Sequence, residues 1–111
     1  MTETEFLNLV DVTMRAIEIQ LEQATDNGDT DVECSRSGNV LEIEFIENGS
    51  KIIINSQAPM QELWLAARSG GFHYTRRDGA WVNTRDGSEL FVALSQVVSE
   101  QGNAKVTLHA A

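Results

Sequence analysis

The clearest candidate for chemistry is a run of carboxylates in the first third of the chain. Six Asp and Glu residues fall between positions 18 and 33, and no Lys or Arg lies between Arg15 and Arg36. Carboxylate oxygens are the ligands that hard cations prefer, so Ca²⁺, Mn²⁺, Fe²⁺ and Fe³⁺ are all chemically suitable. The candidate ligands are Glu18, Glu22, Asp26, Asp29, Asp31 and Glu33.

Three interpretations of this run are open. It can be a solvated face that keeps the protein soluble, although its self-repulsion costs stability. It can bind hard cations weakly at an exposed site, because its spacing matches no EF-hand and no cluster of His or Cys accompanies it. It can also dock on a basic surface of another protein, where complementary charge accelerates association. The last two interpretations are compatible, and both require carboxylates that stand open to water and are not paired with Arg or Lys.

The net charge of −9 is unevenly distributed along the chain. Residues 1–47 contain twelve Asp and Glu and two Arg, a net charge of −10, whereas residues 48–111 contain five acids and six bases, a net charge of +1. A protein this acidic repels phosphate at long range, which argues against nucleic acid as a partner.

The N-terminal residues and the number of cysteines indicate the cellular compartment of the protein. We find neither the basic start and apolar run of a signal peptide nor an apolar stretch long enough to span a bilayer. The single cysteine, Cys34, excludes an internal disulfide and a cysteine zinc cage, and it suits a reducing compartment. We therefore expect a cytoplasmic protein without a membrane partner.

A long helix and an edge strand must position the carboxylates. Apolar residues recur at helical spacing between Glu3 and Ala24, so we expect a helix of five or six turns with one buried stripe. Asp11, Glu18 and Glu22 are separated by seven and four residues and therefore share another face of this helix. The predicted buried stripe consists of Phe6, Leu9, Val10, Ile17, Leu21 and Ala24.

The acids after the helix lie on a turn and a strand. Asn27-Gly28 marks the end of the helix. The segment from Asp31 to Cys34 alternates with period two, which predicts an edge strand with Val32 and Cys34 facing inward and the carboxylates outward. In that position Cys34 is a small buried hydrophobe and not a reactive thiol.

A second helix is expected near the end of the chain. Asp86 and Glu89 have the spacing of a capping box, and an apolar stripe follows up to Gly102. Trp81, in a short strand before this helix, is expected in the core. The tail from Lys105 to His109 is weakly strand-like and is expected to cover one end of the helix pair, with His109 solvated.

The centre of the chain predicts three strands joined by tight turns. Asn48-Gly49 favours a two-residue hairpin turn, which would place Phe45 opposite Ile52 and Ile43 opposite Ile54. Gln57-Ala58-Pro59 then interrupts the ladder because proline donates no hydrogen bond. The following segments are Glu62 to Ala67 and Phe72 to Tyr74.

Strand parity divides this central sheet into two faces. One face is apolar, and both helices should cover it. Its predicted residues are Ile43, Phe45, Ile52, Ile54, Leu63, Leu65, Phe72 and Tyr74. Asn55, Trp64 and His73 share the opposite, mixed face. The exposed tryptophan is either ordinary surface apolarity or a docking point for a partner, since tryptophan is enriched at interfaces.

These elements predict an α+β fold, a two-layer α-β sandwich in which the N- and C-terminal helices pack on one face of an antiparallel sheet of about five to six strands. The 111 residues suit a single domain, 1–111. No nucleophile-base arrangement, Gly-x-Ser-x-Gly elbow or phosphate-binding glycine loop is present, so we expect no classical enzyme.

The same stretches resemble the frataxin family, in particular its bacterial members. The matching residues are Glu47 to Asn55, Gln57-x-Pro59, Trp64-Leu65-Ala66, Ser69-Gly70-Gly71-x-His73-Tyr74, the Trp81 strand and the Asp86-Gly87 turn. With the acidic N-terminal helix and the C-terminal helix around them, the resemblance covers nearly the whole chain.

This resemblance implies an iron-binding regulator or iron donor in iron-sulfur cluster assembly. It implies weak iron binding along the first helix and first strand, at Glu18, Glu22, Asp26, Asp29, Asp31 and Glu33 with Asp11, which we call the acidic ridge. It also implies association with a cysteine desulfurase and its scaffold protein, and a sheet face for partners at Asn55, Gln57, Trp64 and His73. We expect a monomer in the absence of metal.

Two alternatives to this function are open. One is a ferroxidase or iron-storage assembly, although the sequence supplies no Glu-x-x-His ligation of the ferritin kind. The other is a metal-indifferent adaptor that binds proteins through Trp64 and its neighbours.

Overall fold

In the computed structural model, which describes residues 1–110, the chain begins with the long helix α1, Glu3–Asp26. Thr2 caps it: its hydroxyl accepts a hydrogen bond from the Glu5 amide at 3.1 Å, while the Glu5 carboxylate accepts one from the Thr2 amide at 2.9 Å. This reciprocal arrangement satisfies two of the free amides of the first turn. Asn27 ends the helix as predicted, and Gly28 follows with a φ of +80°.

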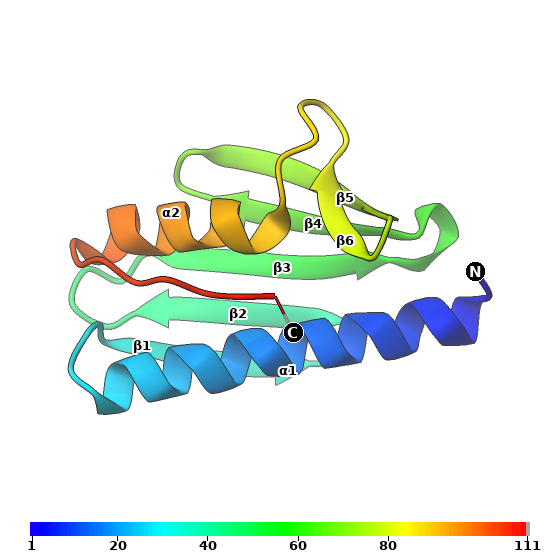
Figure 1. The fold of residues 1–111 in the computed structure, drawn as a ribbon. Helices are drawn as coiled ribbons and strands as arrows, with labels where there is room; N and C mark the ends of the chain where they lie inside the picture. Colours follow the sequence, from blue (N-terminus) through cyan, green and yellow to red (C-terminus); the bar gives the residue numbers. More distant parts are fainter. Residues whose placement is uncertain (111) are drawn as a thin grey trace.

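Six antiparallel strands follow, and their order in the sheet is their order in the chain. Because every connection is a hairpin, each strand pairs with the next along the sequence (Figure 1). The strands are β1 Val32–Ser37, β2 Val40–Phe45, β3 Lys51–Gln57, β4 Glu62–Ala67, β5 Gly70–Arg77 and β6 Ala80–Asn83. A short 3-10 turn, η1 at Ala58–Met60, separates β3 from β4 where proline was expected to break the ladder.

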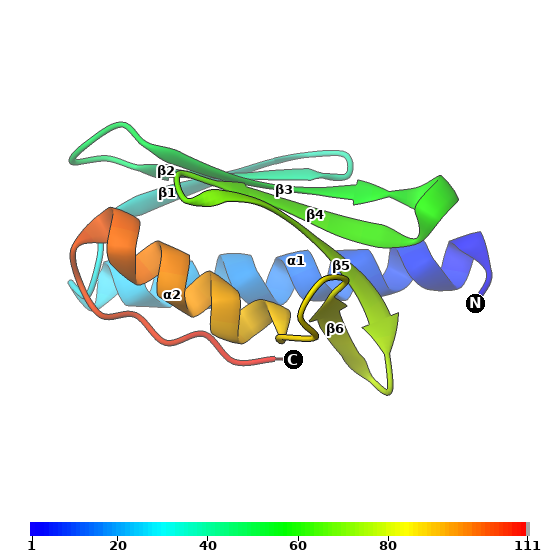
Figure 2. The same ribbon diagram turned by 90° about the horizontal axis from the view of Figure 1, so that it is seen from above.

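The second helix, α2, spans Leu90–Gly102 and packs with α1 on the same face of the sheet. Figure 2 shows the sheet as one layer and the helix pair as the other, with β5 and β6 bending toward the helices. The predicted α+β two-layer sandwich is confirmed. The core between the layers includes Phe6, Ile17, Ile54, Tyr74 and Trp81, all at most 1% exposed.

The core contains one tryptophan whose polar end is satisfied. Trp81 meets Phe6 edge to face, with ring centroids 6.1 Å apart, and its indole N–H donates to the Thr13 hydroxyl at 2.9 Å. The Thr13 hydroxyl in turn donates to the Leu9 carbonyl of the preceding helical turn at 2.7 Å. The expectation that Trp81 belongs to the core is thus confirmed.

The predicted β2–β3 register is wrong by two residues. Ile43 lies opposite Ile52 and Leu41 opposite Ile54, because the connection spans residues 46–50 instead of Asn48-Gly49 alone. The Asn48 side chain accepts a hydrogen bond from the Ser50 amide and donates one to the Gln101 carbonyl, so it ties the loop to α2. A shift of two keeps every side chain on its predicted face.

Two expectations at the end of the chain are also wrong. Glu89 itself caps α2, with its carboxylate accepting from the amides of Phe91 and Val92, while Asp86 bonds to Ser88 in the loop before it. Between residues 104 and 110 the tail forms no strand. It runs over the helices on the side away from the sheet, where Val106 and Leu108 are buried and the Ser95 and Ser99 hydroxyls of α2 bond to their backbone (Figure 2).

Candidate functional site

The end of α1 and the edge strand β1 bring four of the predicted ligands into one shallow pocket. Glu18, Glu22 and Asp26 lie one helical turn apart on α1, and Glu33 of β1 lines the same hollow of about 300 Å³ with them. Strand alternation turns the Glu33 side chain outward, away from α1. Thr25 fixes this arrangement, because its hydroxyl bonds to both the amide and the carbonyl of Val32, at 3.3 and 3.4 Å. The helix and the strand edge are therefore held together at the pocket.

The remaining acids of the ridge lie around the corner. Asp29 and Asp31 line a larger open pocket of about 500 Å³, together with Glu47 from the β2–β3 loop and Gly102 at the end of α2. Glu47 was not among the predicted ligands, because only the observed β2–β3 loop brings it beside the α1–β1 connection. Asp11 lies in neither pocket, so the structure gathers six of the seven predicted residues at two neighbouring hollows.

Two ridge carboxylates are paired with arginine, contrary to the expectation that all stand free. Arg36 of β1 lies 2.9 Å from Asp11 and 3.7 Å from Glu18, measured between guanidinium nitrogens and carboxylate oxygens. Arg15 adds a second contact to Asp11 at 3.1 Å. Strand alternation explains the pairing, since Arg36 lies on the same side of β1 as Val32 and therefore faces α1. Alternation alone could have placed Arg36 on the inner side of β1, but not opposite Asp11 or Glu18.

Burial, and secondly the neighbouring carboxylates, raise the pKa of the one thiol in the pocket. Cys34, half-buried beside Glu18 and Glu22, has its pKa raised to about 11, mainly because burial disfavours the thiolate and secondly because the two carboxylates repel it. Cys34 is therefore a neutral thiol at neutral pH and not a reactive nucleophile, in line with the sequence interpretation.

The donor set suits weak binding of hard cations. Within residues 1–110 no three His, Cys, Asp or Glu side chains are close enough to hold one metal ion together. Glu22, Asp26, Asp29, Asp31 and Glu33 are nevertheless all exposed oxygen donors. A cation held there would keep most of its water ligands, which means low affinity and low selectivity.

The mixed face of the sheet carries the second group of predicted residues. Asn55 of β3, Trp64 of β4 and His73 of β5 lie side by side in register, as strand parity predicted. The rings of Trp64 and His73 are stacked, with centroids 4.2 Å apart and an interplanar angle of 5°. Gln57 joins this row through a hydrogen bond from its amide to the Asn55 side-chain oxygen at 2.9 Å.

One residue that sequence reasoning missed orients this aromatic pair. The Glu62 carboxylate accepts a hydrogen bond from the Trp64 indole N–H at 2.9 Å, and the same oxygen lies 3.6 Å from Nδ1 of His73. Glu62 lies two positions before Trp64 and so on the same face of β4, which was the available signal. The stack is thereby fixed as a half-exposed platform beside a hollow lined by Ile53 and Ala66.

A frataxin-like domain model matches residues 1–104 of the chain. The chain belongs to the frataxin-like family. Frataxin from Psychromonas ingrahamii has the same fold, with a TM-score of 0.87 and 34% sequence identity over 96% of this chain and 97% of its own. A trimeric frataxin from the yeast Saccharomyces cerevisiae, complexed with ferrous iron, shares the fold at a TM-score of 0.72 and 24% identity, covering 86% of each chain.

The frataxin-like sequence is also similar to bacterial proteins along nearly their whole length. The protein of Janthinobacterium sp. (strain Marseille) is 64% identical over 97% of this chain and 96% of its own, and that of Herminiimonas arsenicoxydans is 62% identical over the same shares. Both are named iron-sulfur cluster assembly protein CyaY. Neither helix of the described residues, 1–110, is long and apolar enough to cross a membrane.

Proposed function

We propose that this frataxin-like protein is a non-enzymatic component of iron-sulfur cluster assembly that carries iron weakly on its acidic ridge. The observation that carries the proposal is the 64% identity, over nearly the full chain, to a protein named for cluster assembly. The chemistry of the ridge supports it, because five exposed carboxylates without a gathered set of three ligands suit a cation that must be released again.

We further propose that the ridge docks on a basic patch of a cysteine desulfurase. The charge asymmetry supports this step, since residues 1–47 carry a net charge of −10 and the rest of the chain carries +1. Such a one-sided field accelerates encounter with a basic surface and selects its orientation. The scaffold protein of the pathway is the proposed partner for the sheet face at Asn55, Gln57, Trp64 and His73.

The test of the ridge is a pull-down and an activity assay with the desulfurase. Changing Asp29→Asn, Asp31→Asn and Glu33→Gln together should weaken binding about tenfold at low salt. A variant with Glu3→Gln, Asp78→Asn and Glu100→Gln loses the same three charges from exposed positions outside the ridge and should bind as the unmodified protein does. Equal binding by both variants would reject the ridge as the docking surface.

An adaptor that acts through the sheet face alone is the second candidate, favoured by the exposed stack of Trp64 on His73. In that case Trp64→Ala would abolish binding of the partner while the three ridge substitutions would not. Titration with Fe²⁺ under anaerobic conditions, followed by NMR, separates the two functions, because the adaptor predicts no change at any ridge carboxylate.

A further inference from the structure

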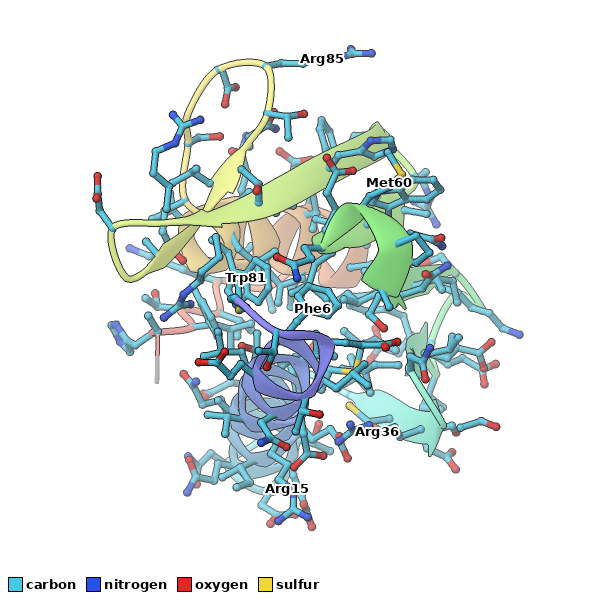
Figure 3. All side chains as sticks on the ribbon, turned by 90° about the vertical axis from the view of Figure 1, so that its right-hand side faces the viewer. Phe6, Arg15, Arg36, Met60, Trp81 and Arg85 are labelled. Carbon is cyan, nitrogen blue, oxygen red and sulfur yellow. The ribbon has the colours of Figure 1, made fainter. Side chains whose placement is uncertain are left out.

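Arg36 holds the N-terminal part of the acidic ridge. It comes from β1, yet its guanidinium reaches across to α1, where it contacts Asp11 at 2.9 Å and Glu18 at 3.7 Å. Figure 3 shows Arg36 between the strand and the helix, whereas Arg15 projects from the outer side of α1. Arg36 is therefore packed between two elements, whereas Arg15 is attached to one helix and extends away from it.

Burial supports a fixed position for Arg36. Its side chain is 22% exposed, while that of Arg15, which contacts only Asp11, is 71% exposed. One Glu18 carboxylate oxygen is buried without a hydrogen bond, so Arg36 is the cation that compensates it. Both oxygens of Asp11 are engaged as well, one by each arginine.

The other five carboxylates of the ridge differ from Asp11 and Glu18 in their charge partners and in their exposure. Within residues 1–110 no Lys, Arg or His lies within 4.0 Å of the other five carboxylates. These five are exposed, whereas Asp11 and Glu18 are half-buried. The five are Glu22, Asp26, Asp29, Asp31 and Glu33.

We propose that Arg36 is a built-in counter-ion that excludes cations from Asp11 and Glu18 and confines their binding to the C-terminal end of the ridge. This inference rests on the proposed cation-binding function and names which part of the ridge performs it. A divalent cation at Glu18 would have to displace the guanidinium or sit beside a positive charge. At Glu22, one helical turn further on, no such charge interferes.

The experiment uses Ca²⁺ as a diamagnetic hard cation and follows the side-chain carboxylate carbons by NMR. In the unmodified protein the signals of Glu22 and Glu33 should shift with Ca²⁺, and the signal of Glu18 should not. In Arg36→Gln the Glu18 signal should respond, with an apparent affinity for Ca²⁺ roughly fivefold higher.

Arg15→Gln is the matched control, because it also removes one positive charge that contacts Asp11 but does not free Glu18. Its Glu18 signal should stay as silent as that of the unmodified protein. Arg36→Lys keeps the charge and should also keep Glu18 silent, which separates exclusion by charge from loss of packing.

The outcomes for the two proposals are distinguishable. Silence at Glu22 and Glu33 in the unmodified protein would refute cation binding by the ridge, while the difference at Glu18 between the Arg36 and Arg15 variants would still report on Arg36. A Glu18 response equal to that of Glu22 in the unmodified protein would overturn the inference, and this comparison needs no variant to fold. Silence of Glu18 in a folded Arg36→Gln would overturn it too.

Discussion

Cys34 shows how the acidic ridge acts on a single side chain. Its pKa, ordinarily 9.0, is raised to about 11, mainly by burial and then by Glu18 and Glu22. Because the folded value lies above the unfolded one, the folded state retains the thiol proton at a pH where the unfolded chain has lost it. The stability contributed by this group is complete below pH 9 and is lost as the pH rises toward 11.

We therefore predict that the free energy of unfolding falls more steeply between about pH 8 and pH 11 for the unmodified protein than for Cys34→Ala. Urea unfolding at a series of pH values measures both. Tyr74, whose pKa burial also raises, titrates in both proteins and cancels in the comparison. Parallel pH profiles would contradict the assignment, as would alkylation of folded Cys34 at pH 8 as fast as that of the unfolded chain.

Single positions that depend on strand parity were predictable, and those that depend on a distant partner were not. Asn55, Trp64 and His73 lie in one row as expected, because period-two alternation survives even a register error of two residues. The pairing of Arg36 with Asp11 was missed because it joins residues 25 positions apart, on two elements whose relative placement the sequence pattern does not specify. A charge count along the chain treats such a pair as free.

At the level of elements, the C-terminal turn of α2 is fastened to the sheet by one buried amide. Gln101 is 3% exposed, and its side chain accepts from the Arg68 amide at 2.9 Å and donates to the Ser50 hydroxyl at 3.2 Å. Its own carbonyl accepts from the Asn48 side chain at 2.7 Å. The β2–β3 loop and the β4–β5 loop are thus both hydrogen-bonded to α2 at this residue.

We predict that Gln101→Ala destabilises the protein by about 2–3 kcal/mol, because it leaves the Arg68 amide unsatisfied and opens a small cavity. Gln96→Ala is the matched control: the same residue type in the same helix, exposed, with one hydrogen bond to Glu100 at 3.2 Å. It should cost less than about 0.5 kcal/mol. Urea midpoints at constant m-value measure both changes, and equal losses would disprove the fastening role.

The same residue explains why some elements were predicted and others not. The helices and all six strands were predicted from local periodicity and turn residues, which need no distant partner. The β2–β3 connection did not follow the Asn-Gly rule because Asn48 is used to bond Gln101, 53 positions away. The tail likewise looked strand-like, yet Ser95 and Ser99 of α2 take the place of a neighbouring strand.

At the scale of the whole molecule, the dominant feature is negative charge collected at one corner. Exposed ridge carboxylates and Glu47 gather where α1 ends and β1 begins, and α1 has no basic residue in its last turn to complement the partial negative charge of its C-terminus. Repulsion among these groups favours the unfolded chain, in which they are farther apart. The fold is therefore stable in spite of the repulsion among these carboxylates. The charge asymmetry along the sequence predicted this repulsion.

We predict that screening this corner raises the melting temperature. Raising NaCl from about 10 mM to about 0.5 M shortens the Debye length from about 30 Å to about 4 Å and should raise the melting temperature by about 5 °C. About 5 mM CaCl₂ should raise the melting temperature more than NaCl of equal ionic strength, because binding to the folded state adds to screening.

The variant with Asp29→Asn, Asp31→Asn and Glu33→Gln should melt higher at low salt, and its melting temperature should respond less to either salt. A variant with Glu3→Gln, Asp78→Asn and Glu100→Gln has the same net charge but leaves the ridge intact, so it should retain most of the calcium effect. If both variants lost that effect equally, total charge rather than its collection at the ridge would govern the stability.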